Sequence, residues 1–299
     1  MRFLSPLRYP GGKGLLLKFV RPLVDAMDPA PTSYIEPFAG GAAIALGLLH
    51  SGAVPAAVIG DADPAIAAFW QAALDHPGEF AEAVRSCDVN LDTWHEQAHL
   101  LRTADSADVL ALGFAAFFLN RTNRSGILRA RPIGGLKQDG PYPLDCRFNK
   151  ADLIRRLELV AQLSERITIH AGDAIDLLDQ RCSSEADETF VYADPPYLTK
   201  STDLYLDTMS YSKHQLLAKK LNSGYRRWIV SYDCDAKVAD DLYPDNNILQ
   251  FGLRHSAAKP HRGHELMALS TAIQLTDETR LLHRAIWHRR VTPLHTAMA

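Results

Sequence analysis

Four consecutive residues, Asp194-Pro195-Pro196-Tyr197, place an acid, two prolines and an aromatic ring directly after an apolar run. The prolines lack N–H donors and hold the backbone open, so the Asp194 carboxylate and the Pro195 carbonyl can both accept hydrogen bonds. An ordinary turn after a strand would explain the prolines, but not the acid and the ring together. The motif predicts a pocket for an exocyclic amino group, which carries two N–H donors on a flat ring.

A second motif, Glu36-Pro37-Phe38-Ala39-Gly40-Gly41, lies between an apolar run and an Ala-rich segment. Glycines at a strand-to-helix turn let the backbone approach a nucleotide-like ligand, although glycine pairs also occur there for packing. The spacing is not GxGxxG, so a dinucleotide is not favoured. About twenty residues downstream, Asp61 ends the next apolar run and is expected to accept hydrogen bonds from ribose hydroxyls. Asp63, just before Pro64, is expected to cap a helix.

A third motif, Tyr9-Pro10-Gly11-Gly12-Lys13-Gly14, is a glycine-rich turn that brings a lysine to the start of a predicted helix. It lacks the GxxxxGK[ST] pattern, so ATP hydrolysis has little support. A mobile loop followed by a helix is the plainer interpretation.

Basic residues gather in one stretch of the chain. The net charge of the whole chain is −3, and this near-neutral balance argues against a protein that coats nucleic acid indiscriminately. From Arg121 to Lys137 there are five basic residues and no acid. This run predicts a surface for phosphates and bases, with a solvated loop as the alternative. A second basic loop, Arg254–His264, could close over a DNA backbone, and its histidines lack metal-site spacing.

Short apolar runs that end in polar or acidic residues predict the buried strands of a parallel sheet. They are Ser33–Phe38, Val54–Asp61, Ile167–His170, Thr189–Asp194 and Trp228–Tyr232. Helical patterns separate them at Gly41–Ser51, Pro64–Leu74, Lys150–Ser164 and Lys213–Asn222. This alternation predicts an α/β doubly wound sheet, whose ligands lie at the carboxyl ends of the strands.

The alternation stops between Asp75 and Asn149, where helical patterns at Glu79–Arg85 and Asp108–Leu119 precede a Gly- and Pro-rich hairpin or long loop, Arg131–Tyr142. We therefore expect an inserted domain over residues 75–149. Residues 1–74 and 150–275 would form a discontinuous catalytic domain, and residues 276–299 a C-terminal tail. From Thr279, the tail carries a helix-like pattern.

Composition and cysteine usage indicate a globular protein of the cytoplasm. The chain is 47% hydrophobic and 22% charged, unlike disordered or fibrous proteins. Its cysteines occur singly without CxxC spacing, which predicts reduced thiols and no zinc site. The N-terminus lacks a signal-peptide pattern and the apolar stretches are too short for a bilayer, so no membrane partner is expected.

The order of the motifs over residues 5–272 resembles the Dam-like D12 class of DNA adenine-N6 methyltransferases. The matching segments are Leu7–Gly14, Tyr34–Gly41, Ile59–Asp63, Leu119–Gly126, Gly172–Ala174, Val191–Tyr197 and Ile229–Asp233. The resemblance implies a Rossmann-like methyltransferase sheet that binds S-adenosylmethionine (SAM), with an inserted, mainly helical DNA-recognition domain.

Carried over to this sequence, the resemblance implies a cofactor site, a catalytic pocket and no metal. Asp61 would hold the ribose of SAM and Asp173 would meet its adenine. Tyr197 would stack on a target adenine flipped out of the duplex. The implied cofactor residues are Tyr9, Gly12, Lys13, Phe38, Gly40, Asp61, Asp173 and Asp194, and the implied catalytic residues are Asp194, Pro195, Pro196 and Tyr197.

The partner implied by the resemblance is double-stranded DNA, and a cognate restriction or defence component is left open. Dam-like enzymes typically carry aromatic and amide residues where this chain has Asn123, Arg124 and Ser125, so GATC specificity does not transfer. Arg129 matches a base-reading arginine, which favours guanine. The candidate DNA-binding residues are Arg121, Asn123, Arg124, Ser125, Arg129, Arg131 and Lys137.

Three alternative functions stay open at this point. An amino-group pocket could also serve methylation of cytosine N4 or of RNA adenine, although an aspartate in first position favours adenine within the family. A catalytically silent DNA-binding relative would have no chemical reason to keep Gly40, Asp61 and the Asp194–Tyr197 motif together.

Overall fold

One mixed sheet of eight strands forms the centre of the computed structural model, which describes residues 4–8, 13–105, 108–182, 186–198, 209–255, 261–275, 282 and 284–290. The strand order is β3-β2-β1-β4-β5-β7-β6-β8. The strands are β1 (Ser33–Glu36), β2 (Ala57–Asp61), β3 (Ile167–Ala171), β4 (Thr189–Ala193), β5 (Arg227–Asp233), β6 (Asn247–His255), β7 (His261–Leu269) and β8 (Ile286–Arg289).

The first five strands in this order, from β3 to β5, are parallel, as the sequence predicted. β1 pairs with β2 on one side and with β4 on the other, and β3 and β5 extend the sheet outward in parallel. The direction in which strands are added therefore reverses between β1 and β4. Such a switch point opens a ligand-binding crevice at the carboxyl ends of the strands. The prediction of a doubly wound α/β sheet is confirmed.

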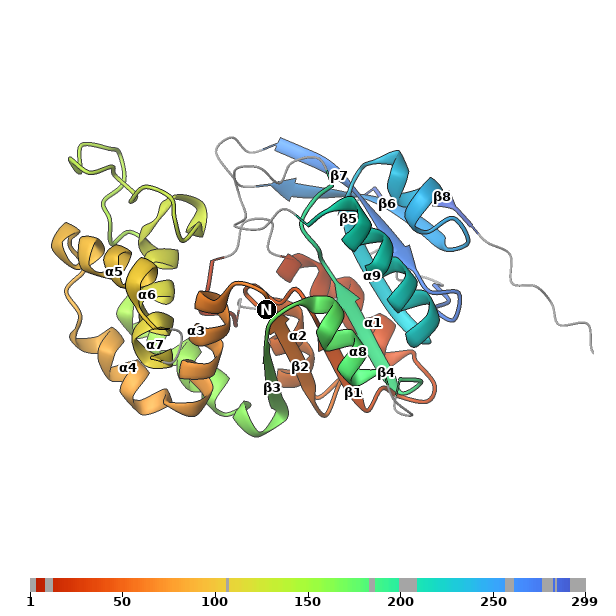
Figure 1. The fold of residues 1–299 in the computed structure, drawn as a ribbon, viewed down its shortest axis with the longest axis horizontal. Helices are drawn as coiled ribbons and strands as arrows, with labels where there is room; N and C mark the ends of the chain where they lie inside the picture. The colour runs from red at the N-terminus through yellow and green to blue at the C-terminus, as the bar shows by residue number, and fades with distance from the viewer. Residues whose placement is uncertain are drawn as a thin grey trace, which may run out of the picture.

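Helices cover both faces of the sheet (Figure 1). α1 (Leu17–Asp25) and α2 (Ala43–His50) lie on one face, and α8 (Ala174–Arg181) and α9 (Tyr211–Gly224) on the other. Successive residues of a strand point to opposite faces of the sheet, so their side chains pack alternately against the two helical layers. Tyr192 thus packs with the α1 and α2 side, and its neighbour Val191 with the α8 and α9 side.

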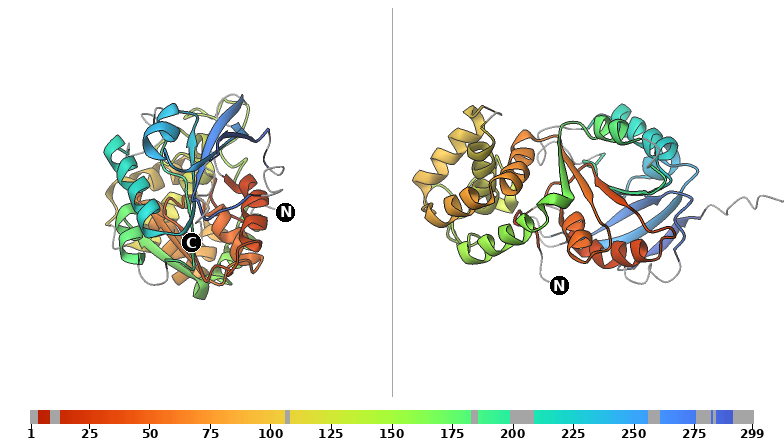
Figure 2. Two further views of the ribbon diagram at one scale, coloured as in Figure 1. Left: turned by 90° about the vertical axis from the view of Figure 1, so that its right-hand side faces the viewer. Right: turned by 90° about the horizontal axis from the view of Figure 1, so that it is seen from below.

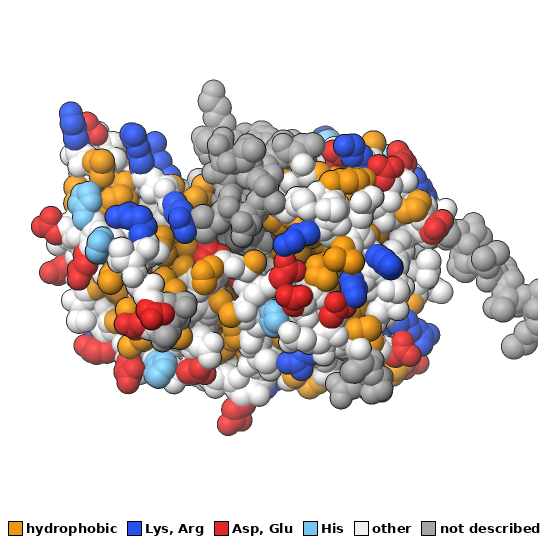
Figure 3. Space-filling view, in the orientation of Figure 1, with side chains coloured by type: hydrophobic (Ala, Val, Ile, Leu, Met, Phe, Trp, Pro, Cys, Tyr) orange, Lys and Arg blue, Asp and Glu red, His pale blue; other side chains and the backbone are white. Residues whose placement is uncertain are grey.

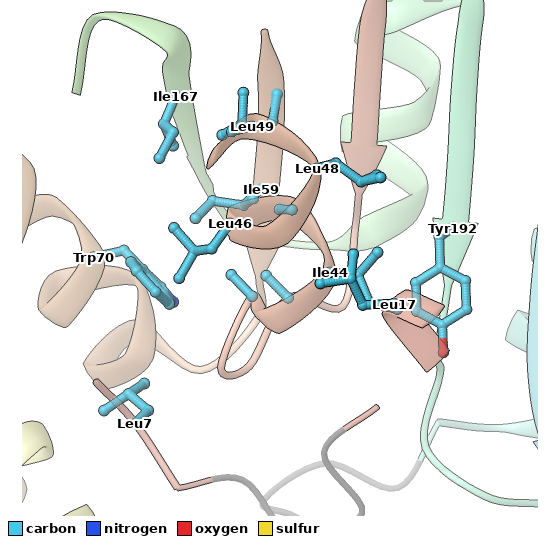
Figure 4. Packing of buried hydrophobic residues seen from close by; sticks show 14 of the residues in the cluster. Leu7, Leu17, Ile44, Leu46, Leu48, Leu49, Ile59, Trp70, Ile167 and Tyr192 are labelled. Carbon is cyan, nitrogen blue, oxygen red and sulfur yellow. The ribbon is translucent and has the colours of Figure 1, made fainter. Parts of the chain in front are cut away.

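The α1 and α2 layer continues into a second group of helices without a break. Leu46 and Leu49 of α2 pack near Ile59 of β2, and Trp70 reaches them from a helix beside the sheet (Figure 4). That helix, α3 (Pro64–Asp75), is followed by α4 (Pro77–Ser86), α5 (Leu91–Thr103), α6 (Val109–Thr122) and α7 (Lys150–Ala161). Figure 2 shows this helical group beside the sheet rather than over either face.

Helix α6 forms the centre of the helical group and is apolar all round. A Cβ added at Gly113 would lie 2.6 Å from the Ala68 carbonyl oxygen, so α6 and α3 approach backbone to backbone. Phe69 of α3 stacks on Phe117 of α6, with ring centroids 5.8 Å apart. One apolar cluster thus joins the helical group to the sheet. The expected boundaries at Asp75 and Asn149 coincide with the end of α3 and the N-cap of α7, and the division into domains stays a prediction.

Two elements differ from the sequence prediction. The helix expected over Thr279–Arg290 is wrong for its C-terminal part, because β8 occupies Ile286–Arg289 and pairs antiparallel with β6. β6 supplies hydrogen-bond partners for the backbone of β8. This pairing cannot be recognised from the periodicity of the local sequence. Helix α5 was not predicted, since most of its side chains are polar and only Gln97 is buried.

The remaining described elements are short. They are the 3-10 helices η1 (Lys13–Leu16), η2 (Arg124–Gly126) and η3 (Ser164–Arg166), and the π-helix η4 (Val238–Leu242). The four cysteines are free. In the described part of the chain, no helix combines the length and the apolarity that crossing a bilayer requires.

Candidate active site

Polar side chains meet on one face of the sheet, beyond the carboxyl ends of β4 and β5. Tyr192 faces the α1 and α2 layer, and Asp194, two residues later, follows the same alternation. Ser231 of β5 donates a hydrogen bond to Asp194 Oδ1 at 2.6 Å. The Tyr192 hydroxyl lies 2.9 Å from Ser231 Oγ, which extends this chain of contacts into the core. The strands therefore fix one oxygen of the Asp194 carboxylate.

Lys13 of η1 brings a buried ammonium group to the same place. Its Nζ lies 3.2 Å from Asp194 Oδ1 and 3.1 Å from Glu265 Oε1 of β7, and the lysine side chain is only 5% exposed. Burial alone would lower the pKa of Lys13, but Asp194 and Glu265 together hold it well above its usual value. Lys13 therefore stays charged between two carboxylates.

Tyr197 closes this cluster from the segment that follows the two prolines. Its hydroxyl donates to Glu265 Oε1 at 3.1 Å, and Lys13 Nζ lies 5.5 Å from the centre of its ring. Burial raises the pKa of Tyr197, so the hydroxyl stays protonated. The next residue, Leu198, donates its backbone N–H to Asp233 Oδ1 at 3.3 Å. The structure thus brings Asp194 and Tyr197 together, with Pro195 buried and Pro196 half-buried between them.

On the other side of the switch point, a hydrogen bond between Gly40 and Asp61 joins the turn after β1 to the carboxyl end of β2. Asp61 accepts from the Gly40 N–H through Oδ2 and from the Asp63 N–H through Oδ1, both at 2.9 Å. The indole N–H of Trp70 donates to the Gly40 carbonyl at 2.8 Å. Gly40 has a φ of 47°, a left-handed conformation that glycine adopts without strain. Asp63 caps α3, as predicted.

Burial disfavours the ionisation of two acids on this side of the site. Burial raises the pKa of Asp61 to about 7. Burial also raises the pKa of Glu36 to about 8, with a further contribution from the nearby Asp194 carboxylate. Glu36 accepts hydrogen bonds from the Ala45 N–H at 2.9 Å and from the Tyr34 hydroxyl at 3.0 Å. A ligand with positive charge would stabilise the ionised forms of these acids.

The other predicted cofactor residues lie along the same edge of the sheet or outside the described residues. Asp173 caps α8 through Oδ1 and pairs through Oδ2 with Lys213 Nζ at 2.8 Å. The next strand tip is close, since the N–H of Gly172 donates to the Asp61 carbonyl at 3.1 Å. Phe38 is partly buried after β1. Tyr9 and Gly12 lie outside the described residues.

The chemistry of this edge fits SAM, which combines a ribose and an adenine with a sulfonium and an amino group. Asp61 offers a carboxylate to the ribose hydroxyls beside the turn at Gly40. Glu36 and Asp194 place carboxyl groups between the two halves of the site, where a sulfonium would favour the ionised form of Glu36. Where the structure describes the chain, no group of three His, Cys, Asp or Glu residues could hold a metal ion.

The predicted DNA-binding residues divide into an exposed group and a buried group. Arg124, Arg129, Arg131 and Lys137 are exposed on the loop after α6, and Ser125 is half-buried. Figure 3 shows basic side chains gathered at the upper left, over this loop, and acidic ones along the lower edge of the same group of helices. The exposed group is placed to contact a polyanion.

Asn123 and Arg121 belong to the buried group, and a direct DNA contact by either residue stays a prediction. The Asn123 side chain is 0% exposed. It accepts from Trp94 Nε1 at 2.6 Å and donates to the carbonyls of Ile127 and Leu128. All of its partners are therefore within the protein, where it shapes the loop. Burial lowers the pKa of Arg121 to about 9, helped by nearby arginines.

The motifs did not single out three residues that organise the site. Glu265 begins the apolar stretch of β7, and Ser231 interrupts the apolar residues of β5. Asn120 lies near the end of the apolar helix α6. A polar side chain in an otherwise apolar strand or helix was the available signal, since burial of a polar group requires a partner. The prediction of a second basic loop over Arg254–His264 is wrong at both ends, because β6 continues to His255 and β7 begins at His261. Residues 256–260 are outside the described residues.

A family model described as D12 class N6 adenine-specific DNA methyltransferase matches residues 9–256. No curated protein matches the chain in sequence.

Two solved structures match the chain at low similarity. One is a Pyrococcus horikoshii protein of proposed RNA methyltransferase function, with 10% identity and a TM-score of 0.39 over 88% of this chain and 86% of that chain. The other is the rRNA methyltransferase aviRa from Streptomyces viridochromogenes, with 12% identity and a TM-score of 0.40 over 87% of this chain and 85% of that chain. The family match, which spans most of the chain, shows that the protein belongs to the D12 class of N6 adenine-specific DNA methyltransferases.

Proposed function

We propose that the protein transfers a methyl group from SAM to the exocyclic N6 amine of adenine within a specific sequence of double-stranded DNA. The observation that carries the proposal is the Asp194 carboxylate, whose Oδ1 is held by Lys13 at 3.2 Å and by Ser231 at 2.6 Å beside the Tyr197 ring. An amino group on a flat base complements this arrangement of acceptor and aromatic ring.

The pocket residues would activate the amine through orientation and hydrogen bonding. Adenine N6 is a poor nucleophile, because its lone pair is delocalised into the ring. Acceptance of its two hydrogens by Asp194 and the Pro195 carbonyl would favour the tetrahedral nitrogen of the transition state. SAM supplies an electrophilic methyl group, so the protein needs to provide positioning and charge rather than a covalent intermediate.

The target adenine would have to leave the helix, because its N6 atom is paired inside the duplex. Tyr197 would stack on the flipped base. The exposed basic residues of the loop after α6 would contact the DNA around it. A cognate restriction or defence component and a cytoplasmic location stay predictions from the sequence.

The reaction can be tested with SAM labelled in its methyl group and a mixture of duplex DNA sequences. Digestion of the product to nucleosides, followed by mass spectrometry, should yield N6-methyladenine. N4-methylcytosine, or methylation of RNA in place of DNA, would overturn the assignment of the substrate. Expression in a methylation-deficient host, followed by sequencing for modified adenines, should give one consensus motif.

The Asp194→Ala variant separates chemistry from cofactor binding. Methyl transfer should be abolished while SAM binding, measured by calorimetry, survives. Substantial methylation by this variant would refute the role given to Asp194. Failure of the unaltered protein to bind SAM would indicate a silent DNA-binding relative.

A further inference from the structure

Glu265 lies at the centre of the candidate active site, although no motif pointed to it. Its side chain is 1% exposed, and β7 places it opposite Asp233 of β5. Met267 and Leu269, on the same face of β7, pack into the α1 and α2 layer. Glu265 therefore points to the face from which Lys13 enters.

One oxygen of Glu265 organises two pocket residues. Oε1 accepts from Lys13 Nζ and from the Tyr197 hydroxyl, each at 3.1 Å. Lys13 then reaches Asp194 Oδ1, which also accepts from Ser231. Among the described residues, Asp194 Oδ2 has no such partner. Oδ2 is the oxygen that remains for a substrate N–H.

The charges of this cluster show why a second acid is needed. Lys13 alone would neutralise Asp194 and leave the pocket with a neutral ion pair. Burial raises the pKa of Glu265, whereas the adjacent Lys13 favours its ionised form. With all three groups ionised, they carry one net negative charge in a buried setting, where charges interact strongly.

The proposed reaction moves the positive charge of the SAM sulfur to the amine nitrogen beside this cluster. The N6 lone pair forms a bond to the methyl carbon while the C–S bond breaks and its electron pair stays on sulfur. The nitrogen is cationic until its proton passes to Asp194 Oδ2 and then to water. A cluster with net negative charge stabilises this cation better than a neutral pair.

Resting on the proposed methyl transfer, we infer that Glu265 is a positioning residue that offsets the charge of Lys13 and holds Tyr197 beside Asp194. It acts through these neighbours and does not itself touch the base. Its effect should therefore appear in the rate of chemistry rather than only in folding.

The first test is Glu265→Gln, which keeps the shape and an acceptor oxygen but removes the charge. At saturating SAM and DNA, its single-turnover methylation rate should fall about 100-fold. Thermal unfolding should confirm that it folds, and Glu158→Gln, on the exposed face of α7, is the matched control. A folded Glu265→Gln protein with the unaltered rate would overturn the inference.

The second test restores the net negative charge of the cluster by removing the charges of both Lys13 and Glu265. Lys13→Met with Glu265→Gln leaves Asp194 as the charged member of the cluster, so part of the lost single-turnover rate should return at a SAM concentration shown by calorimetry to saturate the double variant. A double variant as slow as or slower than Glu265→Gln would indicate a structural role and contradict the inference.

The third test needs no catalysis and separates this inference from the proposed function. SAM carries a positive sulfur and S-adenosylhomocysteine a neutral one, so Glu265→Gln should reduce the ratio of their affinities in calorimetry. An unchanged ratio would count against the charge-offset role even if the unaltered protein methylates no DNA. Absence of methylation by the unaltered protein would refute only the proposed reaction.

Discussion

Asn120 and Arg8, far apart in the sequence, are joined by two hydrogen bonds of 2.7 Å. The Asn120 side chain accepts from the Arg8 N–H and donates to the Arg8 carbonyl, as a neighbouring strand would. It also donates to the Gly126 carbonyl at 2.8 Å. Gly126 has a φ of 79°, and a Cβ there would lie 2.4 Å from the Arg8 carbonyl oxygen. One amide thus fixes the N-terminal segment that leads to Lys13 against the basic loop.

We expect Asn120→Ala to weaken both folding and SAM binding. The substitution leaves three backbone groups without their partner, at a cost of about 2 kcal/mol in the free energy of unfolding. SAM affinity should fall as well, because Arg8 leads into the turn that carries Lys13. Chemical denaturation and calorimetry measure the two effects. Asn222→Ala, which removes one 3.2 Å bond to Asn246, is the control and should leave SAM affinity unchanged. Equal SAM affinity in both variants would disprove this coupling.

SAM affinity should rise with pH through the ionisation of Asp61. Its folded pKa of about 7 lies above the ordinary value of 3.8, so its contribution to folding stability is complete below about pH 4 and is lost as the pH rises through about 7. Ribose hydroxyls donate to the carboxylate, so SAM should bind the ionised form. From pH 5.5 to 7.0, affinity should increase about tenfold, with proton release.

Calorimetry in buffers of different ionisation enthalpy would count the released proton. Asp61→Asn should bind SAM weakly and with little dependence on pH, whereas Asp63→Asn should retain the dependence. A steep pH dependence in the Asp61→Asn protein would assign the proton to another group, with Glu36 as the next candidate.

Local signals in the sequence predicted the parts of the structure that depend on neighbours along the chain. The apolar runs gave the five parallel strands, and Asp63 was recognised as a cap from the proline that follows it. Glu265 was not recognised, because its role depends on an antiparallel pairing of β7 with β5 and on contact with Lys13, 252 residues away. The tail was misread for the same reason, since β8 exists through its pairing with β6.

The basic run from Arg121 to Lys137 shows the same limit of prediction from local sequence. Its composition predicted a DNA-contacting surface, and Arg124, Arg129, Arg131 and Lys137 are exposed as that requires. Charge and spacing could not reveal that Asn123 is enclosed by Trp94 and the loop backbone. Burial distinguishes the Asn123 side chain, which contacts the protein, from the exposed basic side chains, which DNA can reach.

Asn123→Ala should therefore destabilise the loop rather than remove a base contact. The substitution removes the partner of the Trp94 N–H and of two backbone carbonyls, which should cost about 3 kcal/mol in the free energy of unfolding. Hydrogen exchange should increase over residues 123–132, and DNA affinity should fall equally for all sequences. A changed recognition motif with normal stability would instead support direct readout by Asn123.

The exposed arginine at position 129 offers a test of sequence readout with a built-in control. Arg129→Ala should relax the methylation motif at one position, with a guanine as the expected loss, because an arginine at a base edge binds guanine through two acceptors. Lys137→Ala, exposed on the same loop, should weaken binding to all sequences and reduce the salt dependence by about one ion contact. Methylome sequencing and salt-dependent binding measure the two effects. If Arg129→Ala methylates the same motif as the unaltered protein, Arg129 contacts only phosphates. Both variants would then differ from the unaltered protein only in their affinity for DNA.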